Sequence, residues 1–169
     1  PGLRKLNYNA GILFEKRGVL GPASKFVSSL KGALERPDAY DKKSIDARAG
    51  FVYDLTRRQR LSGEARLEWS EITDVLNPTP RRFLLASVPI EYAFDARDNR
   101  LDPKNGYRFL VHGEPTYNLL GGNFFLKARG EASAYKSLDE DGRIVVAGRL
   151  AAGSILGSSL DDIPADRRF

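Results

Sequence analysis

Cysteine is absent from this 169-residue chain, and His112 is its only histidine. The lack of cysteine excludes a disulfide framework and a thiolate metal site. With one histidine and no cysteine, the sequence offers no Cys/His pair and no convincing Ser/His/Asp set for nucleophilic catalysis. We therefore expect neither an enzyme activity nor a cofactor.

Long apolar runs are also lacking: no stretch of about 18 apolar residues occurs, so the sequence predicts no membrane-spanning helix. The chain begins with Pro1, and nothing near its start resembles a signal peptide, so we expect it to be an internal piece of a longer protein. A net charge of +5 could suggest nucleic acid, but the cations alternate with carboxylates and form no basic stripe. We expect no nucleic-acid partner.

Alternation between apolar and polar residues dominates what is present. It is clearest from Ser44 to Ser70, where two strands are predicted on either side of the polar connection from Arg57 to Arg60. Because side chains alternate between the faces of a strand, each strand has one uncharged, mostly apolar face and one charged face. About a dozen residues is long for a globular strand but is about the length that crosses a bilayer at a tilt of roughly 40°. The uncharged face carries Ile45, Ala47, Ala49, Phe51, Tyr53 and Leu55, then Leu61, Gly63, Ala65, Leu67 and Trp69.

The same period of two recurs along the chain and predicts about eight strands. Charged residues fall on the apolar face only at strand ends. Pro89 lies inside the fifth predicted strand, which indicates an edge, a bulge or a locally disturbed ladder. Asp139 to Gly142 superficially resembles a calcium loop but lacks the remaining ligands, so a hairpin turn is the better interpretation. The other strands are predicted around Tyr8–Phe14, Phe26–Leu34, Leu84–Ala96, Tyr107–Tyr117, Phe124–Ala134 and Ile144–Ala152.

Apolar and polar residues also alternate along the strands of a soluble β-sandwich, so other features must distinguish a sandwich from a membrane barrel. The apolar face is rich in Ala and Gly, and its aromatic residues lie mostly toward strand ends, as interfacial girdles do. The charged face is dense in opposite charges, which suits a wet lumen. Short connections at Arg57–Arg60 and Ser137–Gly142, against a longer one at Thr73–Pro80, match turns and loops on opposite sides of a membrane. We predict an all-β fold, an antiparallel up-and-down transmembrane β-barrel.

The charged face defines the predicted lumen lining. Opposite charges on neighbouring strands contribute only about 0.2–1 kcal/mol each, so we interpret them as a structural lining rather than a reactive site. His112 shares this face and is interpreted as a solvated or hydrogen-bonded lumen residue. The predicted lumen-facing charges are Asp46, Arg48, Glu64, Arg66, Glu68, Arg108, Glu114, Arg129, Glu131 and Arg149.

The most distinctive stretch runs from Asp95 to Tyr107. An Asp-Pro pair pre-sets φ, an Asn-Gly pair tolerates positive φ, and Asp side chains can cap backbone N–H groups. We interpret the stretch as a structural turn, with contact to a specific partner as the alternative. Its candidate residues are Asp95, Arg97, Asp98, Asp102, Pro103 and Gly106.

The pattern of this stretch, D-x-R-D-x-x-x-D-P-x-x-G-Y between two strands, resembles a periplasmic turn in the barrels of outer-membrane assembly and translocation proteins. These proteins form the surface-antigen or BamA/TamA superfamily. The runs Tyr135–Arg143 and Gly153–Gly157, with Arg149-Leu150 between them, resemble its TamA-type branch more closely. So does the closing stretch, which in that branch approaches the large sixth extracellular loop and here contains Ile163, Pro164, Asp166, Arg167, Arg168 and Phe169.

The resemblance implies that residues 1–169 form roughly the first half of a 16-stranded barrel, with the POTRA domains and the second half of the barrel outside the chain. It implies an integral protein of the outer-membrane bilayer of a Gram-negative bacterium that inserts or translocates unfolded β-barrel and autotransporter substrates. A TamB-like periplasmic protein would be its partner. In the mechanism proposed for such proteins, a weak seam between first and last strands opens, and substrate strands pair with the exposed edge.

Three alternatives remain open from the sequence. One is a two-partner secretion transporter of the same superfamily, and another is a passive porin-like channel whose charged lumen selects solutes. The third is a soluble β-barrel that binds a small ligand. An open half barrel leaves two unpaired strand edges, so we also expect the fragment to close on itself, to self-associate, or to be seen with the rest of its protein absent.

Overall fold

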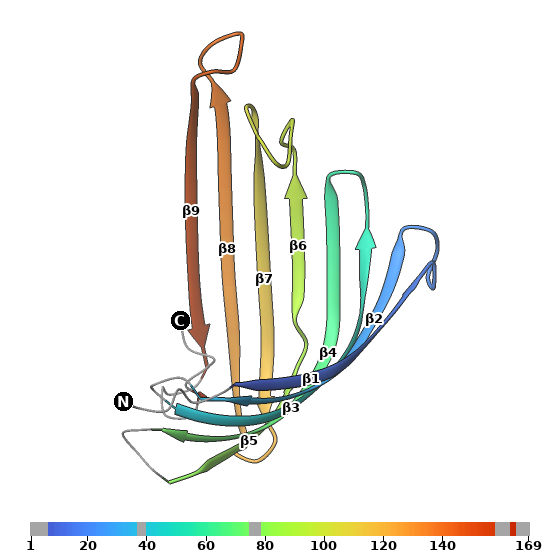
Figure 1. Cartoon of the computed structure of the whole chain (residues 1–169), viewed down its shortest axis with the longest axis vertical. Helices are drawn as coiled ribbons and strands as arrows, with labels where there is room; N and C mark the ends of the chain where they lie inside the picture. The colour runs from blue at the N-terminus through green and yellow to red at the C-terminus, as the bar shows by residue number, and fades with distance from the viewer. Residues whose placement is uncertain (1–6, 37–39, 75–78, 158–162, 165–169) are drawn as a thin grey trace.

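The computed structural model describes residues 7–36, 40–74, 79–157 and 163–164, and nine strands within them form one antiparallel sheet (Figure 1). No helix in these ranges is long and apolar enough to cross a membrane. The strands are β1 (Tyr8–Arg17), β2 (Ser24–Glu35), β3 (Tyr40–Asp54), β4 (Gln59–Asp74), β5 (Arg81–Ser87), β6 (Ile90–Asp95), β7 (Gly106–Asn118), β8 (Asn123–Ser137) and β9 (Val145–Leu156).

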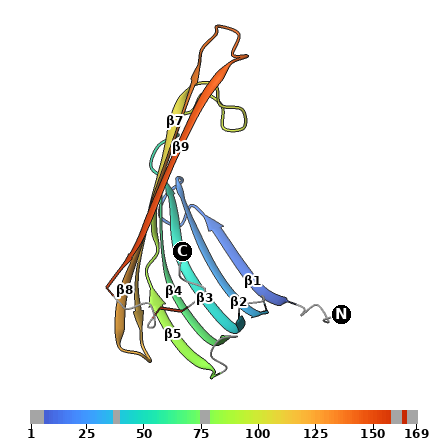
Figure 2. The ribbon, with the colours of Figure 1, turned by 90° about the vertical axis from the view of Figure 1, so that its left-hand side faces the viewer.

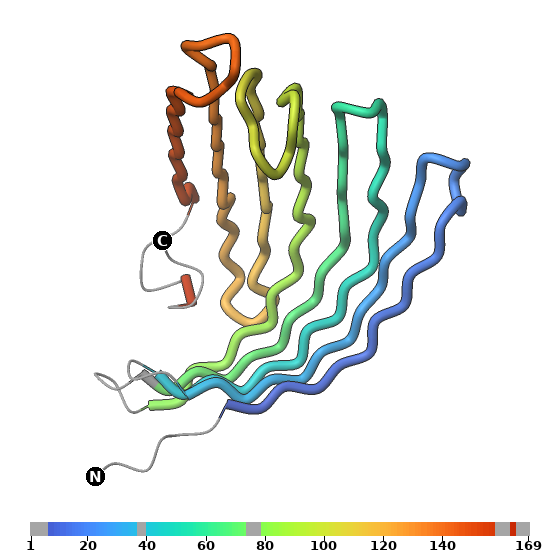
Figure 3. Tube along the Cα trace, turned by 45° about the horizontal axis from the view of Figure 1, so that its top comes forward, coloured from blue at the N-terminus to red at the C-terminus, as the bar shows by residue number. Residues whose placement is uncertain are grey.

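The strands follow one another through the sheet in chain order. The path is β1-β2-β3-β4-β5-β7-β8-β9, and β6 continues β5 end to end, paired to the same two neighbours, β4 and β7. Figures 2 and 3 show the sheet curving strongly between its two outer strands, β1 and β9. The predicted all-β, antiparallel up-and-down fold is confirmed.

The fifth predicted strand is divided in two, which is why the structure has nine strands where the sequence predicted about eight. The break falls at Val88 and Pro89, between β5 and β6. Proline has no N–H to donate to a ladder, so the disturbance expected at this position is present. Backbone hydrogen bonds still join these two residues to the neighbouring strands. Glu64 N–H of β4 donates to the Pro89 carbonyl (3.0 Å), and Val88 N–H donates to the Pro115 carbonyl of β7 (3.1 Å).

The central hairpin is longer than predicted. Its strands run from Tyr40 to Asp54 and from Gln59 to Asp74, not from Ser44 to Ser70. Lys42, which precedes the predicted hairpin, therefore lies inside β3, opposite Ile72 of β4. Register explains the extension, since Lys42 and Lys43 pair with both β2 and β4, while Tyr40 and Asp41 pair with β4.

The predicted separation of short turns from long loops is wrong. One end of the sheet, here called the turn end, carries the connections 18–23, 55–58, 96–105 and 138–144 (Figure 1). The longest of the connections between strands, 96–105, lies at this end, whereas the short connection 119–122 lies at the other. The 96–105 connection is long because it forms an internally hydrogen-bonded turn. The lengths of the connections therefore do not show which end of the sheet lies on which side of a membrane.

Apolar side chains of neighbouring strands form one continuous face. Cross-strand pairs such as Leu30 with Ala47, and Phe109 with Ala132, keep this face in register through the sheet. It is the convex face, and it is exposed: Ile12 is 74% and Leu150 79% accessible, whereas Glu68 on the concave face is 2% accessible. The distribution is inverted relative to a water-soluble protein, in which large apolar patches are buried.

Aromatic rings gather on the convex face toward the turn end. Phe26 lies 6.3 Å from Phe14 and 5.2 Å from Phe51 between ring centroids. On β6 and β7, Phe94 stacks on Phe109 at 5.2 Å. Such a row at one height across a sheet is typical of an aromatic girdle at a membrane interface.

The backbone of β4 approaches β3 closely at Gly50. A Cβ atom there would lie 2.3 Å from the Gly63 carbonyl oxygen and 2.4 Å from Cβ of Glu64. Gly32, on β2, has no atom within 4 Å of the same virtual Cβ. We predict that Gly50→Ala lowers the free energy of unfolding by about 1–3 kcal/mol, because the two strands must separate to admit the methyl group.

Gly32→Ala is the matched control and should change the stability by no more than about 0.5 kcal/mol. The measurement is urea unfolding of the protein in phospholipid vesicles, followed by tryptophan fluorescence. Equal effects of the two substitutions would show that the close approach of the two strands at Gly50 does not limit the side chain there.

Candidate functional site: the concave ion network and the 96–105 turn

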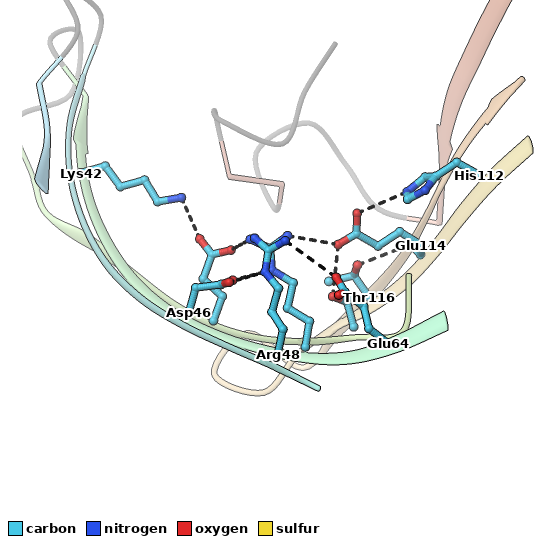
Figure 4. A network of polar contacts seen from close by, with 10 residues as sticks. Lys42, Asp46, Arg48, Glu64, His112, Glu114 and Thr116 are labelled. Atoms are coloured by element: carbon cyan, nitrogen blue, oxygen red, sulfur yellow. Dashed lines mark hydrogen bonds and ion pairs between the residues drawn. The ribbon is translucent and has the colours of Figure 1, made fainter. Parts of the chain in front are cut away.

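Charged residues of β3 and β4 face each other on the concave side of the sheet. Asp46 pairs in register with Glu68, and Arg48 with Arg66. Each of these positions lies one residue away from an apolar residue on the convex face, so strand periodicity places all four charges together. Figure 4 shows Lys42, Asp46 and Arg48 projecting from the inner surface of the curved sheet.

Glu68 and Arg66 are at the centre of this network. The Glu68 carboxylate accepts hydrogen bonds from Lys42 Nζ at 2.7 Å and from Arg66 Nη2 at 2.6 Å. Asp46 accepts from Arg66 Nε at 2.5 Å and also from Arg48 Nε. Both oxygens of Glu68 are used, which is what a carboxylate needs when its residue is only 2% accessible.

The network continues across the sheet to β7. Arg66 Nη1 lies 3.6 Å from Glu114 Oε1, which also accepts a hydrogen bond from Ser87 Oγ at 3.1 Å. His112 lies between two carboxylates, with Nε2 3.8 Å from Glu114 and Nδ1 3.9 Å from Glu91 (Figure 4). The guanidinium group of Arg66 therefore contacts carboxylates from three strands: Asp46 of β3, Glu68 of β4 and Glu114 of β7.

The predicted lumen charges fall into separate groups. Asp46, Arg48, Glu64, Arg66, Glu68 and Glu114 belong to the network just described, which Glu64 joins through Arg48 at 3.7 Å. A second group lies on β8 and β9, where Glu131 contacts Arg129 (3.2 Å) and Arg149 (2.8 Å). Arg108 interacts electrostatically with Glu131 of the second group and also lines a hollow at the turn end.

The 96–105 turn is built around the carboxylate of Asp98. It accepts the backbone N–H groups of Asn99 (2.8 Å), Lys104 (3.0 Å) and Asn105 (3.0 Å). These donors, that of Asn105 first, hold the pKa of Asp98 below its ordinary value, because they stabilise the charged carboxylate. The side chain thus adds to the backbone hydrogen bonds that close the turn, from Ala96 N–H to the Tyr107 carbonyl (2.9 Å) and from Asp98 N–H to the Asn105 carbonyl (3.0 Å).

The other predicted turn residues have distinct positions. Arg97 makes two hydrogen bonds of 2.8 Å to Asp95. Gly106 has φ +110°, and a Cβ atom there would lie 2.3 Å from the Ala96 carbonyl oxygen, so only glycine fits. Asp102 and Pro103 lie on the exposed arc of the turn, where Asp102 N–H donates to the Asn99 side chain at 3.3 Å.

The predicted hairpin at Asp139 is organised in the same way. Its carboxylate accepts the backbone N–H groups of Arg143 (2.9 Å) and Ile144 (3.0 Å). The donors lower the pKa of Asp139, that of Ile144 most strongly. Both oxygens are therefore used within the turn.

Two residues of the predicted approach to loop six are described. Ile163 is 2% accessible and Pro164 is buried, and this short segment lies on the concave side of the sheet (Figures 3 and 4). Asp166, Arg167, Arg168 and Phe169 lie outside the described residues.

Sequence reasoning missed the apolar cluster on the concave face. Ile72, Phe83 and Leu85 are buried together with Tyr40 packed against them, and Phe125 of β8 is 2% accessible. A signal was present, because Phe83-Leu84-Leu85 and Phe124-Phe125 interrupt the alternation and place apolar side chains on both faces. The role of Lys42 was missed because the residue lies outside the predicted hairpin, which begins at Ser44.

A curved antiparallel sheet that exposes an apolar convex face and buries charges on its concave face is the wall of a membrane-embedded β-barrel. The Omp85 superfamily domain matches residues 3–169, and the chain belongs to this superfamily. Its members are outer-membrane β-barrel proteins that insert or secrete other proteins. No curated protein sequence matched the chain.

Arg66 tests the network most directly. We predict that Arg66→Met lowers the free energy of unfolding by about 3–5 kcal/mol, because Asp46 and Glu68 would keep buried charges without their main partner. The control is Arg60→Met. Arg60 binds Asp54 at 2.7 Å, but both side chains are more than half exposed, so its loss should cost about 0–1 kcal/mol.

Unfolding in urea, measured in the same vesicles for both variants, compares the two arginines. A loss at Arg66 no greater than that at Arg60 would show that the concave ion pairs add nothing beyond ordinary surface pairs.

Proposed function

We propose that the chain is part of the barrel of a TamA-type outer-membrane assembly factor, which inserts or translocates other outer-membrane proteins, autotransporters among them. A TamB-like periplasmic protein would work with it. Within the Omp85 superfamily, the sequence likeness of Tyr135–Arg143 and of the stretch approaching loop six supports this branch over a two-partner secretion transporter. We also propose that the function involves no catalysed reaction.

The observation that carries this proposal is the first strand. β1 is one of the two edge strands of the described sheet: it pairs with β2 alone, as β9 pairs with β8 alone, and all ten of its residues are exposed. It is also shorter than β3 and β4, which have 15 and 16 residues. An unpaired edge presents a row of N–H and C=O groups that another strand can pair with.

A substrate strand would therefore bind by extending the sheet at β1. Main-chain hydrogen bonds supply most of the affinity in this mode, so the site accepts many sequences, as an assembly factor requires. In a bilayer these backbone groups have no water to bind, which strengthens the drive to pair. The apolar convex face would continue from β1 onto the added strand.

Site-specific disulfide cross-linking tests the proposal, because the chain contains no cysteine of its own. Ile12 of β1 and Ile45 of β3 are both exposed on the convex face, at 74% and 55%. Ile12 lies on an edge strand of the sheet, whereas Ile45 lies on a strand with a neighbour on each side. We predict that Ile12→Cys forms disulfides with a substrate barrel stalled during assembly and carrying single cysteines along its last strand. The cross-links should recur at every second substrate position.

Ile45→Cys is the control, since β2 and β4 occupy both sides of β3. It should give no cross-link to the substrate strand. Equal cross-linking from both positions, or none from Ile12 while the substrate still assembles, would contradict pairing at β1.

A porin-like channel is a second candidate, favoured by the charged concave face. A channel would pass a steady ionic current in planar bilayers without substrate, whereas an assembly barrel filled by an ion network and a buried Ile163-Pro164 segment should conduct little.

A further inference from the structure

Three hollows open on the concave face and share the residues that line them. The first, of about 130 Å³, lies at the turn end and shares Asp54 and Arg60 with the second, of about 420 Å³. The second shares Val52, Ser62 and Glu91 with the third, of about 240 Å³, which ends at Pro89 and His112. Together they form one continuous depression, here called the arginine trough, that leads inward from the turn end.

The entrance of the trough is strongly basic. Five arginines line the first hollow, against two aspartates. Both aspartates are engaged, since Asp54 binds Arg60 at 2.7 Å and Asp95 binds Arg97 at 2.8 Å. Arg17 and Lys25 extend the basic lining into the second hollow. The arginines of the entrance are Arg57, Arg58, Arg60, Arg100 and Arg108.

Two of these arginines, Arg57 and Arg58, have guanidinium groups available for a ligand, because neither forms an ion pair with another described residue. Arg108 interacts electrostatically with Glu131, while Arg60 and Arg100 contact Asp54 and Asp95. Guanidinium groups bind carboxylates through paired hydrogen bonds, which favours arginine wherever an anion of this shape is recognised. A cluster of them at the mouth of a concave surface also attracts anionic ligands from a distance.

The shape and position of the trough identify the class of ligand. It lies on the concave face, whereas lipid would contact the convex face, where Phe94 and Phe109 form the aromatic row at the same end. A line of connected hollows suits an extended chain better than a compact headgroup. We propose that the arginine trough binds an acidic polypeptide segment that enters the concave face from the turn end.

This inference rests on the proposed function only for the origin of the segment, which would belong to a substrate or to the periplasmic partner. The binding step itself needs no strand exchange at β1. A binding assay therefore tests it separately from the cross-linking at Ile12.

Fluorescence anisotropy of a labelled octaglutamate peptide, added to the protein in detergent micelles, measures the binding. We expect octaglutamate to bind and octalysine not to bind, with an affinity that falls as salt rises from roughly 50 mM to roughly 500 mM. The triple variant Arg57→Gln/Arg58→Gln/Arg108→Gln, which removes the entrance arginines that form no close ion pair, should weaken binding about tenfold or more.

A control variant removes the same charge from exposed arginines elsewhere. Arg36→Gln/Arg81→Gln/Arg82→Gln alters arginines at the opposite end of the sheet from the trough entrance and should change the affinity less than about twofold. Equal weakening by both variants, or none by the trough variant, would overturn the proposal. Octaglutamate failing to bind while phosphatidylglycerol vesicles bind through the trough arginines would overturn it in favour of a lipid headgroup. If Ile12 still cross-links to substrate in the trough variant, the function proposed for β1 is unaffected by either result.

Discussion

The register between β3 and β4 is the constraint on which the rest of the structure depends. It places the apolar side chains of both strands on the convex face and their charges on the concave face. A slip of one residue would exchange the two faces of one strand, exposing charge to lipid and leaving apolar groups in the lumen. Arg66 opposes such a slip, because it binds Asp46 across the strand pair and Glu68 along its own strand. Breaking one member of this group leaves buried charges without partners, so the network specifies the register more than it adds net stability.

Much of the fold follows from a period of two that is visible in the sequence. Alternation identifies the strands from Tyr8 to Leu156 because each has one face in lipid and one in the lumen, and Pro89 marks the break because it lacks an N–H group. The partner of Lys42 could not be predicted, since Glu68 is far away in sequence and only the register brings them together. The prediction that short turns and long loops lie at opposite ends of the sheet failed because the 96–105 turn is long for a local reason. Its backbone is capped by the side chain of Asp98. The concave cluster around Phe83 was overlooked because alternation was sought on one face only.

The features that bear on function lie at different places on one sheet. The edge of β1 offers backbone groups to an incoming strand, while the trough offers arginines to side chains of a chain that approaches from the turn end. The ion network between them is packed and buried, so it can hold the curvature of the wall while the edge exchanges partners. Two turns closed by aspartates, at Asp98 and Asp139, fix the strand ends beside the trough entrance. A rigid centre with an available edge is what a barrel needs in order to pair with other barrels without unfolding itself.

In a bilayer the convex face contacts lipid and the concave face contacts water. Spin labels on single cysteines along β4, in phospholipid bilayers, test this orientation through their accessibility to oxygen, which dissolves in lipid, and to a nickel chelate, which remains in water. We expect labels at Leu61 and Leu67 to be reached mainly by oxygen and labels at Ser62 and Glu64 mainly by nickel, with a period of two. Nickel reaching all four positions equally, or a reversed pattern, would contradict this orientation of the sheet.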